Sequence, residues 1–287
     1  MGYDLFFRSR EDGAAPPIED LRGFFENRVH YRIDGFIAQY LNDDTGVYFW
    51  FDLAGERSPS FHLNFARPHV FALEASNELA SFVSQFDLLI DDVPAGIEYH
   101  RESFVRGWTD GNRGGYRSAS DPSTGYSGWF TRPAAQIEQE WRWNYQRAAL
   151  QERVGETVFV PKVTYFLAGG ALCSGAVWSD AISVTLPRVD YVVLVRDRGW
   201  TSRLLNREPE VIAVRWNEIE PLAENYRFVV GELGHYQMYW DKPPKDVLAF
   251  FRDRPVNDLP FEGVSADRIL DEETMAEIRE VPVRNSP

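Results

Sequence analysis

Few residues in this sequence have the type and spacing for chemistry, and the first candidate is a nucleophilic cysteine. Cys173 could attack a substrate with His235 as its base and Asp180 to orient the imidazole. A lone cysteine in an apolar run is more often a small buried hydrophobe, so no catalytic residue is assigned here. Ser174 and Ser179 lack the surrounding G-x-S-x-G pattern of the nucleophile elbow.

A second candidate is a metal site after a predicted strand. Asp91, Asp92, Glu98 and His100 are close in sequence and could bind a divalent cation, which makes them weak metal candidates. Their spacing matches no ligand motif, and charged residues at a strand exit are usually solvated. The remaining histidines stand singly in predicted strands or at a helix start: His30, His62 and His69. We therefore predict no metal and no cofactor.

A third candidate is a glycine cluster, Gly169, Gly170 and Gly175. A phosphate-binding loop needs glycines at other spacings and usually a following Lys-Ser or Lys-Thr pair. The cluster instead predicts a turn between two strands.

The strongest candidate for a binding surface is the 107–129 loop. Residues 96–132 are rich in Gly and Ser and show no periodicity, which predicts a long loop. Aromatic and arginine side chains are typical anchors of protein interfaces, and they also stack on single-stranded bases or sugars. The predicted interface residues are Trp108, Arg113, Tyr116, Arg117, Tyr126 and Trp129.

The N-terminal half predicts alternating strands and helices. The expected strands are 3–7, 31–41, 47–53, 61–65 and 87–93, and the expected helices are 17–28 and 68–86. Phe71, Ala75 and Leu79 repeat at helical spacing in the second helix. This order is the split βαβ arrangement of ferredoxin-like folds, so we predict such a lobe over 1–95.

The C-terminal half centres on residues 158–196, the longest apolar, β-branched run in the sequence. It predicts a sheet with helices packed on it. Around it we expect a helix at 133–154, a strand at 211–216, a hairpin at 226–240, a helix from 243 and a short acidic helix from 265. The predicted domains are 1–95, the loop 96–132, and 133–287. The fold class is α+β, with mostly antiparallel or mixed sheets and flanking helices.

Charge and cysteine content argue against some classes of partner and location. The 287 residues carry 44 acidic and 30 basic side chains, a net charge of −14. This balance argues against duplex nucleic acid and permits a basic protein partner. A single cysteine excludes an internal disulfide, and neither a signal peptide nor a membrane span is evident. We expect a cytoplasmic protein with no membrane partner.

We therefore predict a protein-binding module, of the immunity, antitoxin or assembly-subunit type, that binds a basic protein. One alternative is a hydrolase-like enzyme with carboxylates such as Asp91, Asp92 and Asp180 in a cleft between two lobes. Another is binding of single-stranded nucleic acid or glycan by the 107–129 loop.

Overall fold

A computed structural model describes residues 2–11, 14–55, 57, 59–91, 96–120, 128–196, 209–230, 234–256 and 262–280. Over these residues the chain is an α+β protein with seven α-helices and both antiparallel and mixed sheets, which confirms the predicted class. The chain folds into two compact units. The first comprises 1–137 together with 266–287, and the second comprises 138–265.

The first unit is built on a six-stranded antiparallel sheet in the order β2-β3-β4-β5-β1-β6. Its N-terminal elements are β1 (Gly2–Ser9), α1 (Ile18–Glu26), β2 (Tyr31–Asp34), β3 (Ile37–Leu41), β4 (Tyr48–Asp52), β5 (Ser60–Asn64), α2 (Val70–Phe86), β6 (Leu88–Ile90) and α3 (Arg101–Ser120). The single strand expected over 31–41 is two strands. Gly35 adopts a φ of 58° between them, where the Asp34-Gly35 pair turns the chain.

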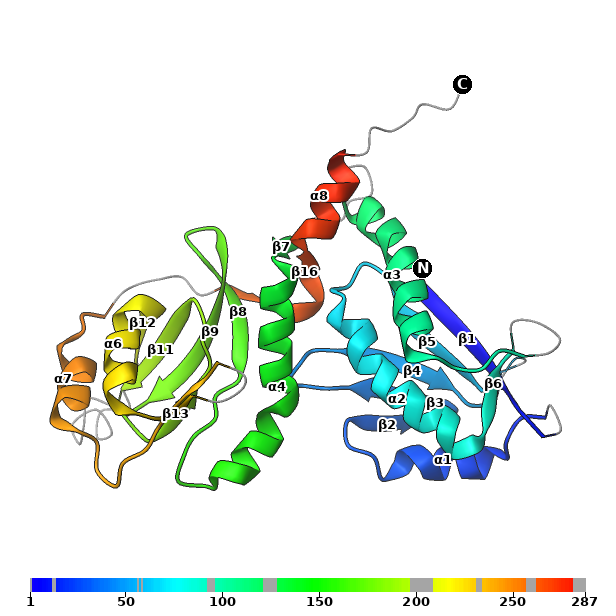
Figure 1. Cartoon of the computed structure of the whole chain (residues 1–287), viewed down its shortest axis with the longest axis horizontal. Helices are drawn as coiled ribbons and strands as arrows, with labels where there is room; N and C mark the ends of the chain where they lie inside the picture. The colour runs from blue at the N-terminus through cyan, green and yellow to red at the C-terminus, as the bar shows by residue number, and fades with distance from the viewer. Residues whose placement is uncertain are drawn as a thin grey trace. The chain divides into compact units, whose positions relative to one another are not determined.

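Helices cover one face of this sheet, because every second side chain on each strand is apolar. Phe7 packs on Phe82 of α2, and Phe25 of α1 packs on Phe51 of β4. Phe61 of β5 meets Phe104 of α3 on the same side. Figure 1 shows α2 and α3 lying across the strands. The other face of the sheet carries the polar side chains described below.

The loop predicted over 96–132 is wrong for residues 101–120, which form α3. Phe104, Trp108 and Tyr116 fall on one face of this helix and are buried. Glycines on a neighbouring line let the helix approach the sheet closely. A Cβ at Gly115 would lie 2.5 Å from the backbone nitrogen of Ala66. Three of the glycines that indicated a loop, Gly107, Gly111 and Gly115, are therefore packing positions.

The C-terminal segment belongs to the first unit. It contains a 3₁₀ turn (Ala266–Arg268), β16 (Ile269–Asp271) and α8 (Glu272–Glu280), and β16 pairs in parallel with β7 (Phe130–Arg132). The acidic helix expected from 265 is present from 272, preceded by a strand that was not expected.

The second unit confirms the predicted sheet within 158–196. Helix α4 (Ala134–Val154) begins in the first unit and runs into the second. The other elements are β8 (Val163–Ala168), β9 (Ala171–Ser179), β10 (Val184–Leu186), β11 (Tyr191–Arg196), β12 (Glu210–Arg215), α6 (Trp216–Tyr226), β13 (Arg227–Val230), β14 (Tyr236–Met238), α7 (Lys245–Asp253) and β15 (Glu262–Val264). Helix α6 had no counterpart among the expected elements.

Two sheets and three helices enclose the core of the second unit. A five-stranded mixed sheet has the order β12-β11-β9-β8-β15, and a three-stranded sheet has the order β10-β14-β13. Trp143 of α4, Trp178 of β9 and Phe251 of α7 are buried in one apolar cluster between them. A membrane-spanning helix is not found in the described part of the chain.

Candidate functional site

The face of the first sheet that lies opposite its helices carries two rows of side chains, each crossing five strands. Strand pairing aligns the first row as Arg32, Gln39, Trp50, His62 and Asp4. The second row, two residues along each strand, is Asp34, Ile37, Asp52, Ser60 and Phe6. The two rows together are called the open face below.

Three residues of the open face form a hydrogen-bonded chain. The Nδ1 atom of His62 lies 2.8 Å from Oδ1 of Asp4 on the neighbouring strand. Its Nε2 atom lies 3.0 Å from the Oγ atom of Ser60 on its own strand. Antiparallel register places Asp4 directly opposite His62, and the two-residue repeat of a strand brings Ser60 to the same face.

Aromatic groups fix the surroundings of this chain. The Trp50 ring stacks on the His62 imidazole, with centroids 5.3 Å apart and planes 14° apart. The guanidinium of Arg57 lies over the Phe6 ring at 3.8 Å. Ser60 is 4% exposed, while the Asp4 side chain is 49% exposed. The hydrogen-bonded chain therefore runs from the buried Ser60 hydroxyl to the Asp4 carboxylate, which is half-exposed to solvent.

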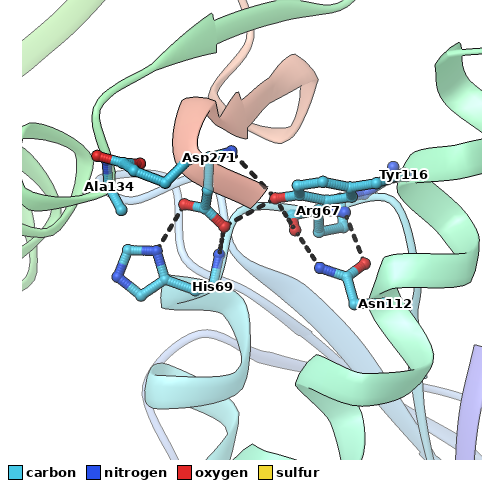
Figure 2. A network of polar contacts seen from close by, with 7 residues as sticks. Arg67, His69, Asn112, Tyr116, Ala134 and Asp271 are labelled. Atoms are coloured by element: carbon cyan, nitrogen blue, oxygen red, sulfur yellow. Dashed lines mark hydrogen bonds and ion pairs between the residues drawn. The ribbon is translucent and has the colours of Figure 1, made fainter. Parts of the chain in front are cut away.

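A second polar cluster in the first unit centres on Asp271 (Figure 2). One carboxylate oxygen lies 2.6 Å from Nδ1 of His69. The other accepts the His69 backbone N–H at 3.0 Å and lies 2.8 Å from the Tyr116 hydroxyl. The Asp271 backbone N–H donates to the same hydroxyl at 3.1 Å. Burial, with the Asp271 charge second, raises the pKa of Tyr116 well above its ordinary value.

Asn112 of α3 extends this cluster to the chain before α2. Its Oδ1 accepts the Ala66 N–H at 2.7 Å. Its Nδ2 donates to the Arg67 carbonyl at 2.7 Å (Figure 2). Ala66 has a φ of 57°, in the left-handed region. The Asp271 cluster therefore joins three segments, β16, α3 and residues 66–69, and its donors and acceptors satisfy one another. We assign it a structural role.

The residues of the predicted loop interface lie in different environments. Trp108 and Tyr116 are buried to 0% exposure, so neither can anchor a partner in this fold. Arg113 pairs with Glu277 of α8 at 3.0 Å, and Arg117 is exposed on α3. Trp129 lies under the guanidinium of Arg67 at 5.7 Å. Tyr126 lies outside the described residues.

The weak metal candidates near residue 91 are paired with arginines. Asp91 lies 3.5 Å from Arg8, and Glu98 lies 3.1 Å from Arg10. His100 is exposed just before α3, and Asp92 lies outside the described part of the chain. No group of three or more potential metal ligands was found among the residues that the structure describes.

The structure separates Cys173 from His235. Cys173 packs with Phe166 on the outer face of the five-stranded sheet. The His235 ring lies 5.4 Å from Trp143, whose side chain belongs to the core on the other face. Asp180 follows the end of β9 and has a φ of 48°. Cys173 and His235 therefore do not meet, and the triad of Cys173, His235 and Asp180 does not form.

The serines considered with Cys173 have structural surroundings. Ser174 is buried and exchanges hydrogen bonds with Asp190, whose Oδ2 lies 3.1 Å from its Oγ. Ser179 is the last residue of β9. Sequence reasoning missed Ser60 and Asp4 altogether and set His62 aside as unpaired. The only local signal was the Ser-x-His spacing on one strand.

Comparisons with protein-family models, curated proteins and solved structures found no match to this chain. The function proposed below therefore depends on the chain's own residues.

Proposed function

We propose that this chain is a protein-binding module whose open face receives a basic protein. Trp50 carries the proposal. It is half-buried at the centre of the five-strand row and presents indole surface beside polar side chains. Tryptophan is one of the residue types enriched in interface hot spots, and interfaces place such apolar groups inside a polar rim.

Charge supports the choice of a basic partner. The first unit contains 26 acidic and 15 basic residues, whereas the second contains 18 and 15. Most of the net charge of −14 therefore belongs to the unit with the open face. Asp4, Asp34 and Asp52 lie on that face. A field of this sign accelerates the approach of a cationic surface and weakens its binding at high salt. Immunity proteins, antitoxins and assembly subunits are proteins that would use such a surface.

The finer fold and location are proposals of the same kind. We propose that residues 1–95 are a ferredoxin-like lobe with two additional edge strands. The strand order β6-β1-β5-β4, with antiparallel neighbours and helices after β1 and β5, supports it. We also propose a cytoplasmic location, which the single cysteine supports.

The binding proposal is tested by comparing two alanine substitutions, one of a tryptophan on the open face and one of a phenylalanine outside it. Tagged wild-type chain, Trp50→Ala and Phe36→Ala would each be purified from the native host, and co-eluting proteins identified by mass spectrometry. Phe36 is a matched control, because it is 56% exposed but lies in the β2–β3 turn, outside both rows. A stoichiometric partner retained by Phe36→Ala and lost by Trp50→Ala is expected.

The partner would then be purified and titrated by calorimetry. We expect Trp50→Ala to weaken binding by about 30-fold, as truncation of a hot spot does. Raising salt should weaken the wild-type complex, and Asp34→Asn should reduce that salt dependence. Binding that survives Trp50→Ala, or that does not respond to salt, would overturn the assignment of the open face and of a basic partner, respectively.

A further inference from the structure

We propose that Ser60 is a nucleophile activated by His62 and Asp4, and that the open face carries an acyl-transfer site for compact esters. This inference goes beyond partner binding and needs no partner. It depends on the hydrogen-bonded chain whose two distances, 3.0 Å and 2.8 Å, lie within the range expected between nucleophile, base and orienting group.

The hydrogen bond between His62 and Asp4 determines which nitrogen of the imidazole carries the proton. A carboxylate only accepts hydrogen bonds, so the proton of the neutral imidazole is on Nδ1, facing Asp4. Nε2 then has a lone pair directed at the Ser60 hydroxyl, which donates to it. This is the state in which histidine can take a proton from serine. Stacking on Trp50 restricts rotation of the ring out of this alignment.

The reaction is balanced without a cofactor. Oγ of Ser60 attacks the ester carbonyl carbon while its proton moves to Nε2 of His62. The C–O bond to the alcohol then breaks, and the alcohol leaves with that proton. Water attacks the acyl-serine, His62 takes a proton from the water, and the carboxylic acid leaves as the proton returns to Oγ. The net change is ester plus water to acid plus alcohol.

Burial sets the substrate class. Because Ser60 is only 4% exposed, a bulky acyl group cannot reach Oγ without displacing its neighbours. Phe6 is its cross-strand neighbour, and Trp50 lies one row away on the adjacent strand. The substrate expected here is an ester with a short acyl chain and an apolar alcohol, because these rings offer apolar contact to the leaving group.

The test is covalent labelling with a small alkyl fluorophosphonate, which phosphonylates activated serines. The full chain would be incubated with the probe, and the modified residue located by tandem mass spectrometry. We expect one phosphonyl group, on Ser60. Ser60→Ala should abolish labelling, and His62→Ala should slow it by about 100-fold, the usual contribution of a general base.

Asp4→Asn separates catalysis from structure. An asparagine amide can donate to Nδ1, which would place the imidazole proton on Nε2 and remove the base, so labelling should slow by about tenfold or more while the fold persists. Ser81→Ala is the matched control, since Ser81 is an exposed helical serine, and it should label as the wild type does.

The labelled protein would also be compared with a heat-denatured sample. Labelling of native Ser60 no faster than of Ser81 or of the denatured chain would overturn the proposal. So would labelling of Ser60 that His62→Ala leaves unchanged. Circular dichroism of each variant ensures that a lost label reflects lost activation and not lost folding. None of these results bears on partner binding, so the two proposals fail separately.

Discussion

Two stretches of this chain contain several glycines, and only one of them forms the structure that its composition predicts. Residues 101–120 contain Gly107, Gly111, Gly114 and Gly115, yet they form the helix α3. Residues 158–196 also contain three glycines and form four strands. The first stretch indicated a loop and the second a sheet, and only the second prediction is confirmed.

The glycines differ in what surrounds them. In α3, a Cβ at Gly107 would lie 2.6 Å from the Tyr3 hydroxyl, and one at Gly111 would lie 2.5 Å from the Phe65 ring. Gly169 and Gly170 have nothing within 4 Å but adopt φ angles of 61° and 84°. One set is needed for close packing, and the other for backbone conformation. A glycine count cannot separate these needs, whereas spacing of four residues separates them.

The largest loss of stability is expected from replacing Asp271, which binds the Tyr116 hydroxyl of α3. Replacing Asp271 by Ala leaves the His69 backbone N–H, the His69 ring and the Tyr116 hydroxyl without their acceptor in a buried site. We expect a loss of about 3–5 kcal/mol in the free energy of unfolding of the first unit, measured by urea denaturation.

Glu273 provides the matched control for Asp271. Its carboxylate accepts one backbone N–H, from Ala134 at 2.9 Å, and this contact is exposed. Glu273→Ala should cost about 1 kcal/mol or less. Equal losses for the two variants would show that the Asp271 cluster does not hold α3 in place.

Adjacent glycines of α3 give the next test. A Cβ at Gly115 would lie 2.5 Å from the Ala66 nitrogen and 2.9 Å from Cβ of Phe65, so the backbone would have to move. Gly115→Ala should destabilise the protein by about 2 kcal/mol. A Cβ at Gly114 meets nothing within 4 Å, so Gly114→Ala should stabilise it by about 0.5–1 kcal/mol through helix propensity. Thermal denaturation of the two variants measures the difference, and a shift of the same sign in both would contradict the packing role.

In the second stretch the same substitution should act through the backbone. Gly169 and Gly170 connect β8 and β9, both with positive φ, as a two-residue hairpin turn requires. Gly170→Ala should cost about 1 kcal/mol in urea denaturation. Gly170→Asn should cost less, because asparagine tolerates the left-handed region. An alanine variant as stable as the wild type would exclude a conformational need for glycine there.

Local patterns therefore gave most of the elements, while contacts between distant segments could not be predicted. The helices α2 and α4 followed from apolar spacing and proline starts. Helix α3 was not predicted, because its glycine and serine content indicated a loop, although Phe104, Trp108 and Tyr116 lie four and eight residues apart on one helical face. The Asp34-Gly35 turn was a local signal that was overlooked.

The candidate site was out of reach for a different reason. Ser60 and His62 are two residues apart, but Asp4 is 58 residues from His62. The three meet only because β1 pairs with β5 in one register, and a shift of one residue would turn Asp4 to the helix-covered face. Register depends on packing of the whole sheet, which no local pattern reveals.

The smallest expected effect concerns His235, because the two units surround a histidine ring differently. His69 is paired with Asp271, whereas the His235 ring is buried beside Trp143 and its Nδ1 has no hydrogen-bond partner among the residues that the structure describes. Burial, with the charge of Arg153 second, lowers the pKa of His235 below its ordinary 6.5. The folded chain then binds this proton more weakly than the unfolded chain does. As far as it depends on His235, the free energy of unfolding of the second unit should therefore be highest above pH 6.5. It should decrease as the pH falls from 6.5 toward the lowered pKa.

His235 is the only histidine within residues 138–265, so its titration can be isolated. An NMR titration of the imidazole Cε1–H signal, assigned by its loss in His235→Gln, should give a midpoint below 6.5. Urea denaturation of His235→Gln should show a weaker pH dependence than the wild type between that midpoint and pH 6.5. A midpoint at or above 6.5 would mean that solvent or a carboxylate reaches the ring, and that the second unit, like the first, gives its histidine ring a polar partner.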